Sequence, residues 1–152
     1  MDSGRRSQLT PKLIDSLYVE AMVLADEARS YFDDQAEEDR QRLEPLARVG
    51  FACESLRVTT RLMHVIAWLL TQRAVSAGEI SAADARTPER SLGEAPGSDH
   101  PLVRSFPESA RMLIQASEEL YNRVRRLERV TGEPQPDFSP ARTLMSRLER
   151  SL

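Results

Sequence analysis

The sequence predicts an all-helical protein, an antiparallel three-helix bundle, and three observations lead to this fold class. Apolar residues recur at alternating spacings of three and four in three long segments. Prolines and glycines stand at the boundaries of these segments, where helices begin and end. No competing strand pattern is present. The 152 residues are enough for one hydrophobic core, so we expect a bundle domain over residues 10–132 and a separate flexible tail over residues 133–152.

The first helix is expected to begin at Thr10, as an N-cap, with Pro11 at the first helical position. Its apolar stripe consists of Ile14, Tyr18, Ala21, Ala25, Ala28 and Phe32. An acidic run over residues 33–39 follows, and its carboxylates lack the alternating spacing of a calcium-binding loop. We therefore expect a solvated turn there.

The second helix is the longest and is predicted over residues 46–77, with Pro45 at its start and Gly78 as its C-terminal cap. Its first apolar stripe is Leu46, Val49, Cys53, Leu56, Thr60, Met63, Ala67, Leu70 and Ala74. A second stripe on another face is Phe51, Ser55, Val58, Leu62, Val65 and Leu69. A helix that is apolar on two faces contacts more than one neighbour. We expect one stripe in the core, the other against a second copy of the chain, and Cys53, Leu56 and Met63 to be buried.

A long loop over residues 79–104 separates the second helix from the third. Prolines and glycines interrupt it, and at most one short helical turn fits at residues 81–85. The loop either spans the bundle from end to end or is a mobile interaction loop, because structureless stretches of this length are uncommon in compact domains. The third helix is predicted from a capping box at Ser105 and Glu108 to Gly132. Its apolar positions are Phe106, Ala110, Leu113, Ile114, Ser117, Leu120, Tyr121, Val124 and Leu127.

The tail combines a proline-containing linker at residues 133–137 with a short amphipathic segment. A helix of this length is not stable alone in water, so we expect it to dock on the bundle or on a partner. The apolar residues assigned to partner contact are Phe138, Leu144, Met145 and Leu148.

Groups that carry chemistry are sparse in this sequence. His64 and His100 are the only imidazoles and Cys53 is the only thiol, and no second metal ligand stands at helical spacing from either histidine. No glycine-rich phosphate loop is present. We therefore predict no enzyme activity, no metal and no cofactor. The single cysteine and the lack of a signal-like or membrane-length apolar run predict a cytoplasmic protein that does not bind a membrane.

The third face of the second helix is the candidate binding face, and its residues are Glu54, Arg57, Arg61, His64 and Trp68. One interpretation is a solvated polar face on which Glu54 pairs with an arginine. A second is a docking surface, because Trp beside Arg is typical of interface hot spots. In a third, Trp68 packs under the long loop. We assign the five residues to partner binding.

Nucleic acid is not an expected partner. The net charge is −3, and the arginines near the end of the third helix also suit the helix dipole. Glutamates at positions 118, 119 and 128 interrupt any basic surface there.

The second helix carries a family resemblance. Residues 54–63, the continuation at residues 68–70 and 72–75, and Gly78-Glu79-Ile80 resemble the RcdA family, alphaproteobacterial proteins named as regulators of CtrA degradation. The first-helix residues 17–18, 20–21 and 27–32 are similar too. The resemblance covers residues 13–80 well and the third helix more loosely, and it does not extend to the loop at 84–104 or to the tail.

The resemblance implies an adaptor for regulated proteolysis: a dimeric three-helix bundle with a flexible C-terminal tail. Such proteins help deliver cell-cycle regulatory proteins to the ClpXP protease. They act with a response-regulator-like primer of the unfoldase and, for some cargo, with a cyclic-di-GMP-binding adaptor. The alternative is a structural or signalling bundle, a protein–protein interaction module with no protease link.

Overall fold

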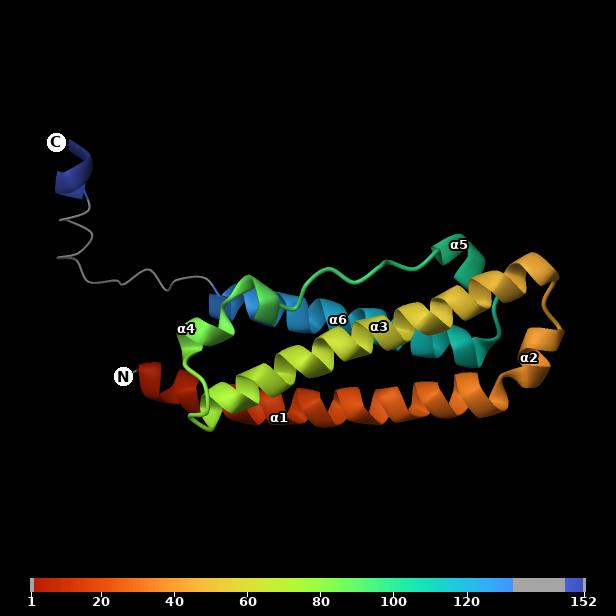
Figure 1. Cartoon of the computed structure of the whole chain (residues 1–152), viewed down its shortest axis with the longest axis horizontal. Helices are drawn as coiled ribbons and strands as arrows, with labels where there is room; N and C mark the ends of the chain where they lie inside the picture. Colours follow the sequence, from red (N-terminus) through yellow and green to blue (C-terminus); the bar gives the residue numbers. More distant parts are fainter. Residues whose placement is uncertain (1, 133–146, 152) are drawn as a thin grey trace.

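Three long helices run along the molecule in the computed structural model, which describes residues 2–132 and 147–151 (Figure 1). In chain order the elements are α1 (Asp2–Arg29), the π-helical turn η1 (Ser30–Gln35), α2 (Glu37–Gln41), α3 (Pro45–Ser76), α4 (Ala82–Ala85), the 3-10 turn η2 (Pro88–Arg90), α5 (His100–Val103) and α6 (Glu108–Gly132). Residues 147–151 are also helical. The described residues contain no strand, which confirms the all-helical class.

The three long helices α1, α3 and α6 pack against one another, and α3 and α6 run in the same direction (Figure 1). Phe51 near the start of α3 contacts Phe106, just before α6, with ring centroids 5.3 Å apart. At the other end, Trp68 of α3 and Glu128 of α6 line one pocket. The relative direction of α3 and α6 therefore differs from the predicted antiparallel arrangement. The reason is the loop, which spans the bundle from end to end before α6 begins.

The core lies between the three long helices and is apolar almost throughout. The second predicted stripe of α3 packs into it: Val58, Val65 and Leu69 have no measurable exposure. The predicted stripes of the first and third helices are also buried or partly buried. At one end of the core, the rings of Tyr31, Phe32, Phe51 and Phe106 pack edge to face with centroids 5.0–6.4 Å apart. Edge-to-face packing suits the charge distribution of aromatic rings.

The end of α3 is built as the sequence predicted. Gly78 has φ +75°, the left-handed conformation that glycine adopts without steric cost. Its N–H donates to the Val75 carbonyl at 3.0 Å, and the Glu79 N–H donates to the Ala74 carbonyl at 2.9 Å. These two bonds satisfy carbonyls at the end of α3.

Two helix starts differ from prediction. α1 begins at Asp2 rather than at Thr10, and Pro11 lies inside it. The ring of Pro11 costs the helix one backbone hydrogen bond, but the helix does not end there. The capping box at Ser105 is not formed. The Ser105 hydroxyl instead donates to the Leu102 carbonyl at 2.6 Å, and α6 begins at Glu108.

The acidic run forms η1 and α2 rather than a plain turn, and most of its carboxylates are exposed. Asp39 is the exception, because it accepts the Tyr31 hydroxyl at 2.6 Å. Burial, followed by this hydrogen bond, raises the pKa of Tyr31. Among the helices that the structure describes, none is long and apolar enough to cross a membrane.

Candidate functional site

The five candidate residues of α3 lie on one side of the helix, but a segment of the long loop covers them. We call this segment the strap and define it as residues 91–99, which contain no helix and lie over α3 and α6. Glu54, Arg61 and Trp68 are at most 3% exposed. The expectation of an open docking face is therefore wrong for the structure as it stands. The alternative, in which Trp68 packs under the long loop, is confirmed.

Glu54 anchors the C-terminal end of the strap. Its carboxylate accepts hydrogen bonds from Ser98 Oγ at 2.6 Å and from the Asp99 N–H at 3.0 Å, and it pairs with Arg57 on its own helix. Burial opposes the charged form, but the bonds from Ser98, Asp99 and Arg57 outweigh burial, and the pKa of Glu54 lies below its ordinary value. Glu54 is thus a buried carboxylate that remains charged because the strap supplies donors.

Arg61 binds the middle of the strap. It donates to the Pro96 carbonyl at 3.1 Å, to Ser98 Oγ at 2.5 Å and, across the core, to Ser117 Oγ on α6 at 3.2 Å. Burial lowers the pKa of Arg61, while the nearby carboxylates of Glu118 and Glu54 act in the opposite direction. Ser98 therefore joins the buried carboxylate and the buried guanidinium through one hydroxyl.

The N-terminal part of the strap is bound by three further side chains. His64 Nδ1 donates to the Leu92 carbonyl at 2.6 Å, and the Leu92 N–H donates to Glu128 of α6 at 2.7 Å. The Tyr121 hydroxyl donates to the Gly93 carbonyl and accepts the Ala95 N–H at 3.1 Å. Of these side chains, His64 alone was predicted from the sequence as a site residue. Tyr121 and Glu128 were missed because nothing in the local pattern links them to a segment 26–36 residues away.

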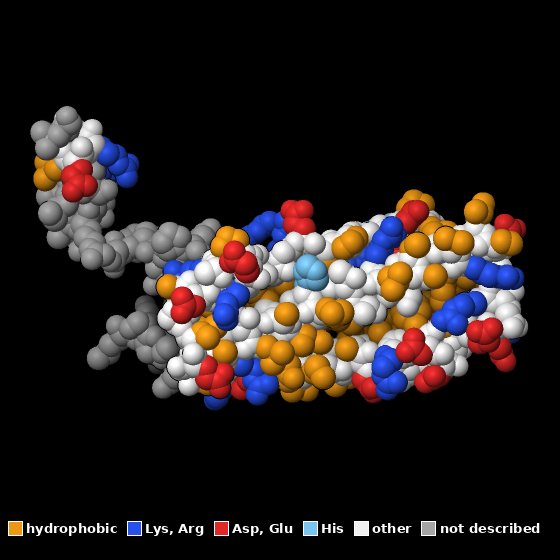
Figure 2. All heavy atoms as spheres, in the orientation of Figure 1, with side chains coloured by type: hydrophobic (Ala, Val, Ile, Leu, Met, Phe, Trp, Pro, Cys, Tyr) orange, Lys and Arg blue, Asp and Glu red, His pale blue; other side chains and the backbone are white. Residues whose placement is uncertain are grey.

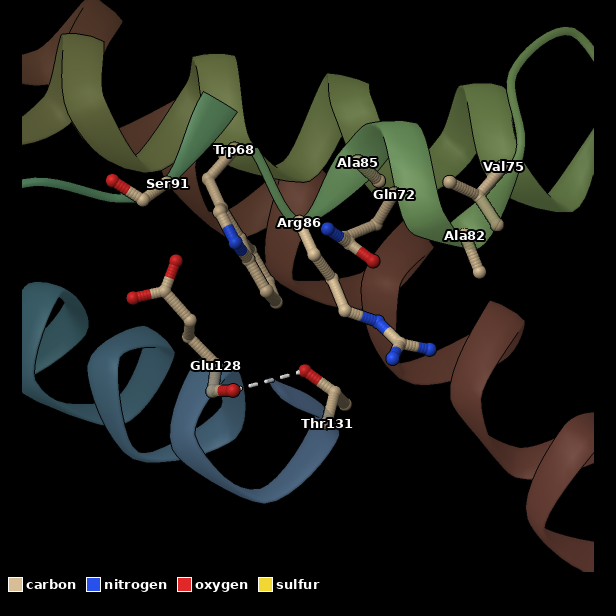
Figure 3. Close-up of a pocket in the computed structure, with 9 residues that line it drawn as sticks. All are labelled: Trp68, Gln72, Val75, Ala82, Ala85, Arg86, Ser91, Glu128 and Thr131. Atoms are coloured by element: carbon tan, nitrogen blue, oxygen red, sulfur yellow. Dashed lines mark hydrogen bonds between the residues drawn. The ribbon is translucent and has the colours of Figure 1, made fainter. Parts of the chain in front are cut away.

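Trp68 closes a pocket of about 410 Å³ at the end of the bundle where α3, α4 and α6 meet (Figure 3). The Glu128 side chain extends from α6 toward the indole, and Arg86 is the residue that follows α4. The remaining lining residues are Gln72, Val75, Ala82, Ala85, Ser91 and Thr131. The loop thus covers Trp68 from α4 as well as from the strap.

The open surface of α3 is the first predicted stripe, which we call the outer stripe. Its large residues are exposed: Leu46 88%, Val49 62%, Leu56 67%, Met63 65% and Leu70 45%. Cys53 is exposed too, so the predicted burial of Cys53, Leu56 and Met63 is wrong. Figure 2 shows hydrophobic side chains along this face of the molecule.

The outer stripe differs from ordinary surface because none of its nine positions carries a charge. Beside it lies a groove of about 310 Å³ between the end of α1 and α3, lined by Ala25, Ala28, Arg29, Phe32, Asp33, Ser55, Thr59, Leu62, Met63 and Ile66. A contiguous apolar surface of this kind is typical of a site at which another protein binds.

The remaining predicted residues fall in two groups. Leu148 lies in the helical segment 147–151 and is 56% exposed. Phe138, Leu144 and Met145 lie outside the described residues. Partner binding by these four, and by the five residues of α3, stays a prediction.

The second histidine and one arginine of α6, Arg123, have partners on other helices. His100 Nε2 lies 3.0 Å from Glu118, and Arg123 lies 2.7 Å from Glu20 on α1. The hydrogen bond that Arg123 donates to Glu20 raises the pKa of Arg123. Within the described part of the chain, no group of three or more His, Cys, Asp or Glu side chains could hold a metal ion.

Fold and surfaces together define a helical protein with an uncharged apolar face and an extended segment held by side chains of two helices. The family model described as "Protein of unknown function (DUF1465)" matches residues 5–152. The crystal structure of RcdA from Caulobacter crescentus CB15 is similar, with 37% identity and a TM-score of 0.64 over 78% of this chain and 90% of that chain. The chain belongs to this family, the RcdA family, and the resemblance is confirmed. Among curated proteins none matches the chain.

Proposed function

We propose that this chain is a non-enzymatic adaptor in regulated proteolysis, which helps deliver cell-cycle regulatory proteins to the ClpXP protease. The observation that supports this most is the family: 37% identity to RcdA extends over 78% of the chain. The RcdA proteins are named as regulators of CtrA degradation, so a shared family favours a shared type of activity. The proposed location is the cytoplasm, where ClpXP acts.

The proposed partners are proteins, not nucleic acids. They are protein cargo, the ClpXP complex with its response-regulator-like primer, a cyclic-di-GMP-binding adaptor for some cargo, and a second copy of the chain. We place the contact with the second copy on the outer stripe. Burying an uncharged stripe with large exposed residues such as Leu56 and Met63 against a second copy would stabilise a dimer, because apolar surface is removed from water.

The proposed mechanism is tethering. A three-helix bundle domain over residues 10–132 would hold one partner, and residues 133–152 would contact another through Phe138, Leu144, Met145 and Leu148. Two partners held on one chain meet at an effective concentration in the millimolar range, which turns a rare encounter into a frequent one. The linker at residues 133–137 would set how far the second contact reaches.

A degradation assay with purified components tests this function. The cargo is a cell-cycle regulator captured by the chain from a native lysate and then purified. Its loss is followed in the presence of ClpXP and primer under three conditions. These are addition of the full chain, addition of a chain that ends at Gly132, and no added chain. We expect the full chain to accelerate degradation at least severalfold, and the shortened chain to melt at the same temperature but to deliver less cargo.

Two results would count against the proposal. A degradation rate that the full chain leaves unchanged refutes the adaptor function. Stable cargo binding without any association with ClpXP or its primer favours the alternative, an interaction module with no protease link. Equal delivery by the shortened and full chains would reject the role of the tail alone.

A further inference from the structure

The strap is held as peptide ligands are held, through its backbone. Six of its backbone groups bond to side chains of α3 and α6: the Leu92 N–H and carbonyl, the Gly93 carbonyl, the Ala95 N–H, the Pro96 carbonyl and the Asp99 N–H. The side chains that make these bonds are His64, Glu128, Tyr121, Arg61 and Glu54. Recognition through backbone groups depends little on the identity of most residues in the bound segment.

The side chains of the strap enter the groove at every third position. Leu92 is 2% exposed, and Ala95 and Ser98 are partly buried, whereas the residues between them are exposed. A spacing of three is typical of extended chains that lack internal hydrogen bonds. The strap thus makes three insertions, one of them large, and has no secondary structure of its own to keep it in place.

The groove that receives the strap is part apolar, where Leu92 and Ala95 join the hydrophobic core, and part polar, where the helices supply buried polar side chains. Glu54, Arg61 and Ser117 are at most 2% exposed, and they belong to α3 and α6 rather than to the strap. If the strap leaves, Glu54 and Arg61 lose the partners that it supplies. A buried polar group without a partner is costly, so an opened groove favours any extended backbone that offers the same donors and acceptors.

We propose that the groove between α3 and α6 is a peptide-binding site and that the strap is its intramolecular competitor. The ligand is an extended segment of a partner protein with an apolar residue and a glycine directly after it. A small residue follows three positions after the apolar residue, and a hydroxyl follows six positions after it. This segment displaces the strap and takes over its backbone bonds. The inference deepens the proposed adaptor function by giving the class of segment that cargo would present, but the groove itself is tested without any protease.

The strap has an advantage over a free peptide because it is tethered on both sides. Its effective concentration is on the order of millimolar, so a weakly binding peptide enters only when the strap has been weakened. Leu92→Asp removes the one large insertion by placing a charge in the groove. Gly93→Ala strains the strap by a second route, because Gly93 has φ +71° and an added Cβ would stand 3.3 Å from His64 Nδ1.

The probe is a fluorescein-labelled peptide with the sequence of residues 90–100, and its binding to the full chain is measured by fluorescence anisotropy. We expect Leu92→Asp and Gly93→Ala chains to bind this peptide at least tenfold more tightly than the unaltered chain. A peptide with aspartate in place of its leucine should bind at least tenfold more weakly. Adding Tyr121→Phe to either chain should weaken binding severalfold, because it removes two backbone contacts of the groove.

Hydrogen exchange on the unaltered chain provides an independent measurement that needs no variant. We expect the amides of Leu92, Ala95 and Asp99 to exchange at least tenfold faster than the buried amides of α3. Unlabelled peptide in excess of the effective concentration of the strap should raise these rates further, because it keeps the strap out of the groove. Strap amides that exchange no faster than those of α3 would overturn the proposal, since the strap would then never vacate the groove. The proposal would also be overturned if the Leu92→Asp or Gly93→Ala chain melts cooperatively, which shows that it is folded, but does not bind the peptide. Peptide binding by a chain that leaves degradation unchanged would refute the adaptor function and leave the peptide site standing.

Discussion

Replacement of Glu54 by glutamine tests whether the polar network under the strap stabilises the fold. Glu54 has no exposure and accepts from Ser98 Oγ, from the Asp99 N–H and from Arg57. Glutamine keeps the shape but turns one acceptor into a donor, so one buried donor loses its partner. That loss costs about 1–3 kcal/mol, and the other bonds lose their charge assistance. We expect Glu54→Gln to lower the free energy of unfolding by about 2–4 kcal/mol, or the melting temperature by roughly 5–15 °C.

The pH dependence of this effect has a definite sign. The pKa of folded Glu54 lies below the ordinary value of 4.5. The charge of Glu54 therefore contributes stability above pH 4.5, and this contribution is lost as the pH falls through the folded pKa. Urea unfolding followed by circular dichroism should show a constant difference between the two chains above about pH 5, and a smaller difference below about pH 4.

The matched control is Glu94→Gln, which removes a carboxylate from an exposed position of the same strap. We expect it to change the free energy of unfolding by less than about 0.5 kcal/mol. If Glu54→Gln melts within 2 °C of the unaltered chain at pH 7, the network does not stabilise the strap, and the reasoning from buried hydrogen bonds fails.

Three further predictions follow from burial on α3. Leu62→Ala, at a position only 3% exposed, should cost about 2–5 kcal/mol. Leu56→Ala on the outer stripe should cost less than about 1 kcal/mol when the chain is diluted to a monomer, because only the dimer would bury this residue. Urea unfolding of the dilute chains compares the two, and equal losses would contradict the assigned orientation of α3. Trp68→Ala should cost about 3–5 kcal/mol by thermal or urea unfolding, since the indole is buried under the loop; a loss below 1 kcal/mol would show that the loop does not cover it in solution. Met63→Asp should shift the monomer–dimer equilibrium toward the monomer, as measured by sedimentation. The control, Arg125→Asp on the exposed surface of α6, should leave this equilibrium unchanged. If the Met63→Asp chain is as dimeric as the unaltered chain, the dimer contact does not lie on the outer stripe.

Much of the fold was predictable because helical periodicity and chain breaks are local properties. The stripes of α1 and α6 and both ends of α3 follow from residues that are neighbours in sequence, such as Pro45 and Gly78. Helix direction did not follow. Whether α6 runs with or against α3 depends on the path of a loop that lacks periodicity, and proline and glycine content does not encode that path.

The orientation of α3 shows a second limit. Two of its faces are apolar, so hydrophobicity alone did not decide which one points inward. The inward face proved to be the one beside Glu54 and Arg61, two charged residues that pattern reasoning places in water. Their burial becomes favourable only through Ser98, Asp99 and Ser117, which lie 37–56 positions further along the chain from the charged residue that each one bonds. The sequence thus brought the five candidate residues together correctly, but their cover lies beyond the reach of local rules.

The shared direction of α3 and α6 has a geometric consequence for a dimer. α6 ends beside the C-terminal end of α3, so Gly132 lies at that same end of the bundle (Figure 1). α3 has 32 residues and is therefore about 48 Å long. If the two-fold axis of a dimer through the outer stripe is perpendicular to α3, residues 133–152 of the two copies begin at opposite ends, roughly 50 Å apart. If the axis is parallel to α3, both begin at one end, so the choice of axis decides whether a dimer presents its two C-terminal segments to one partner or to two.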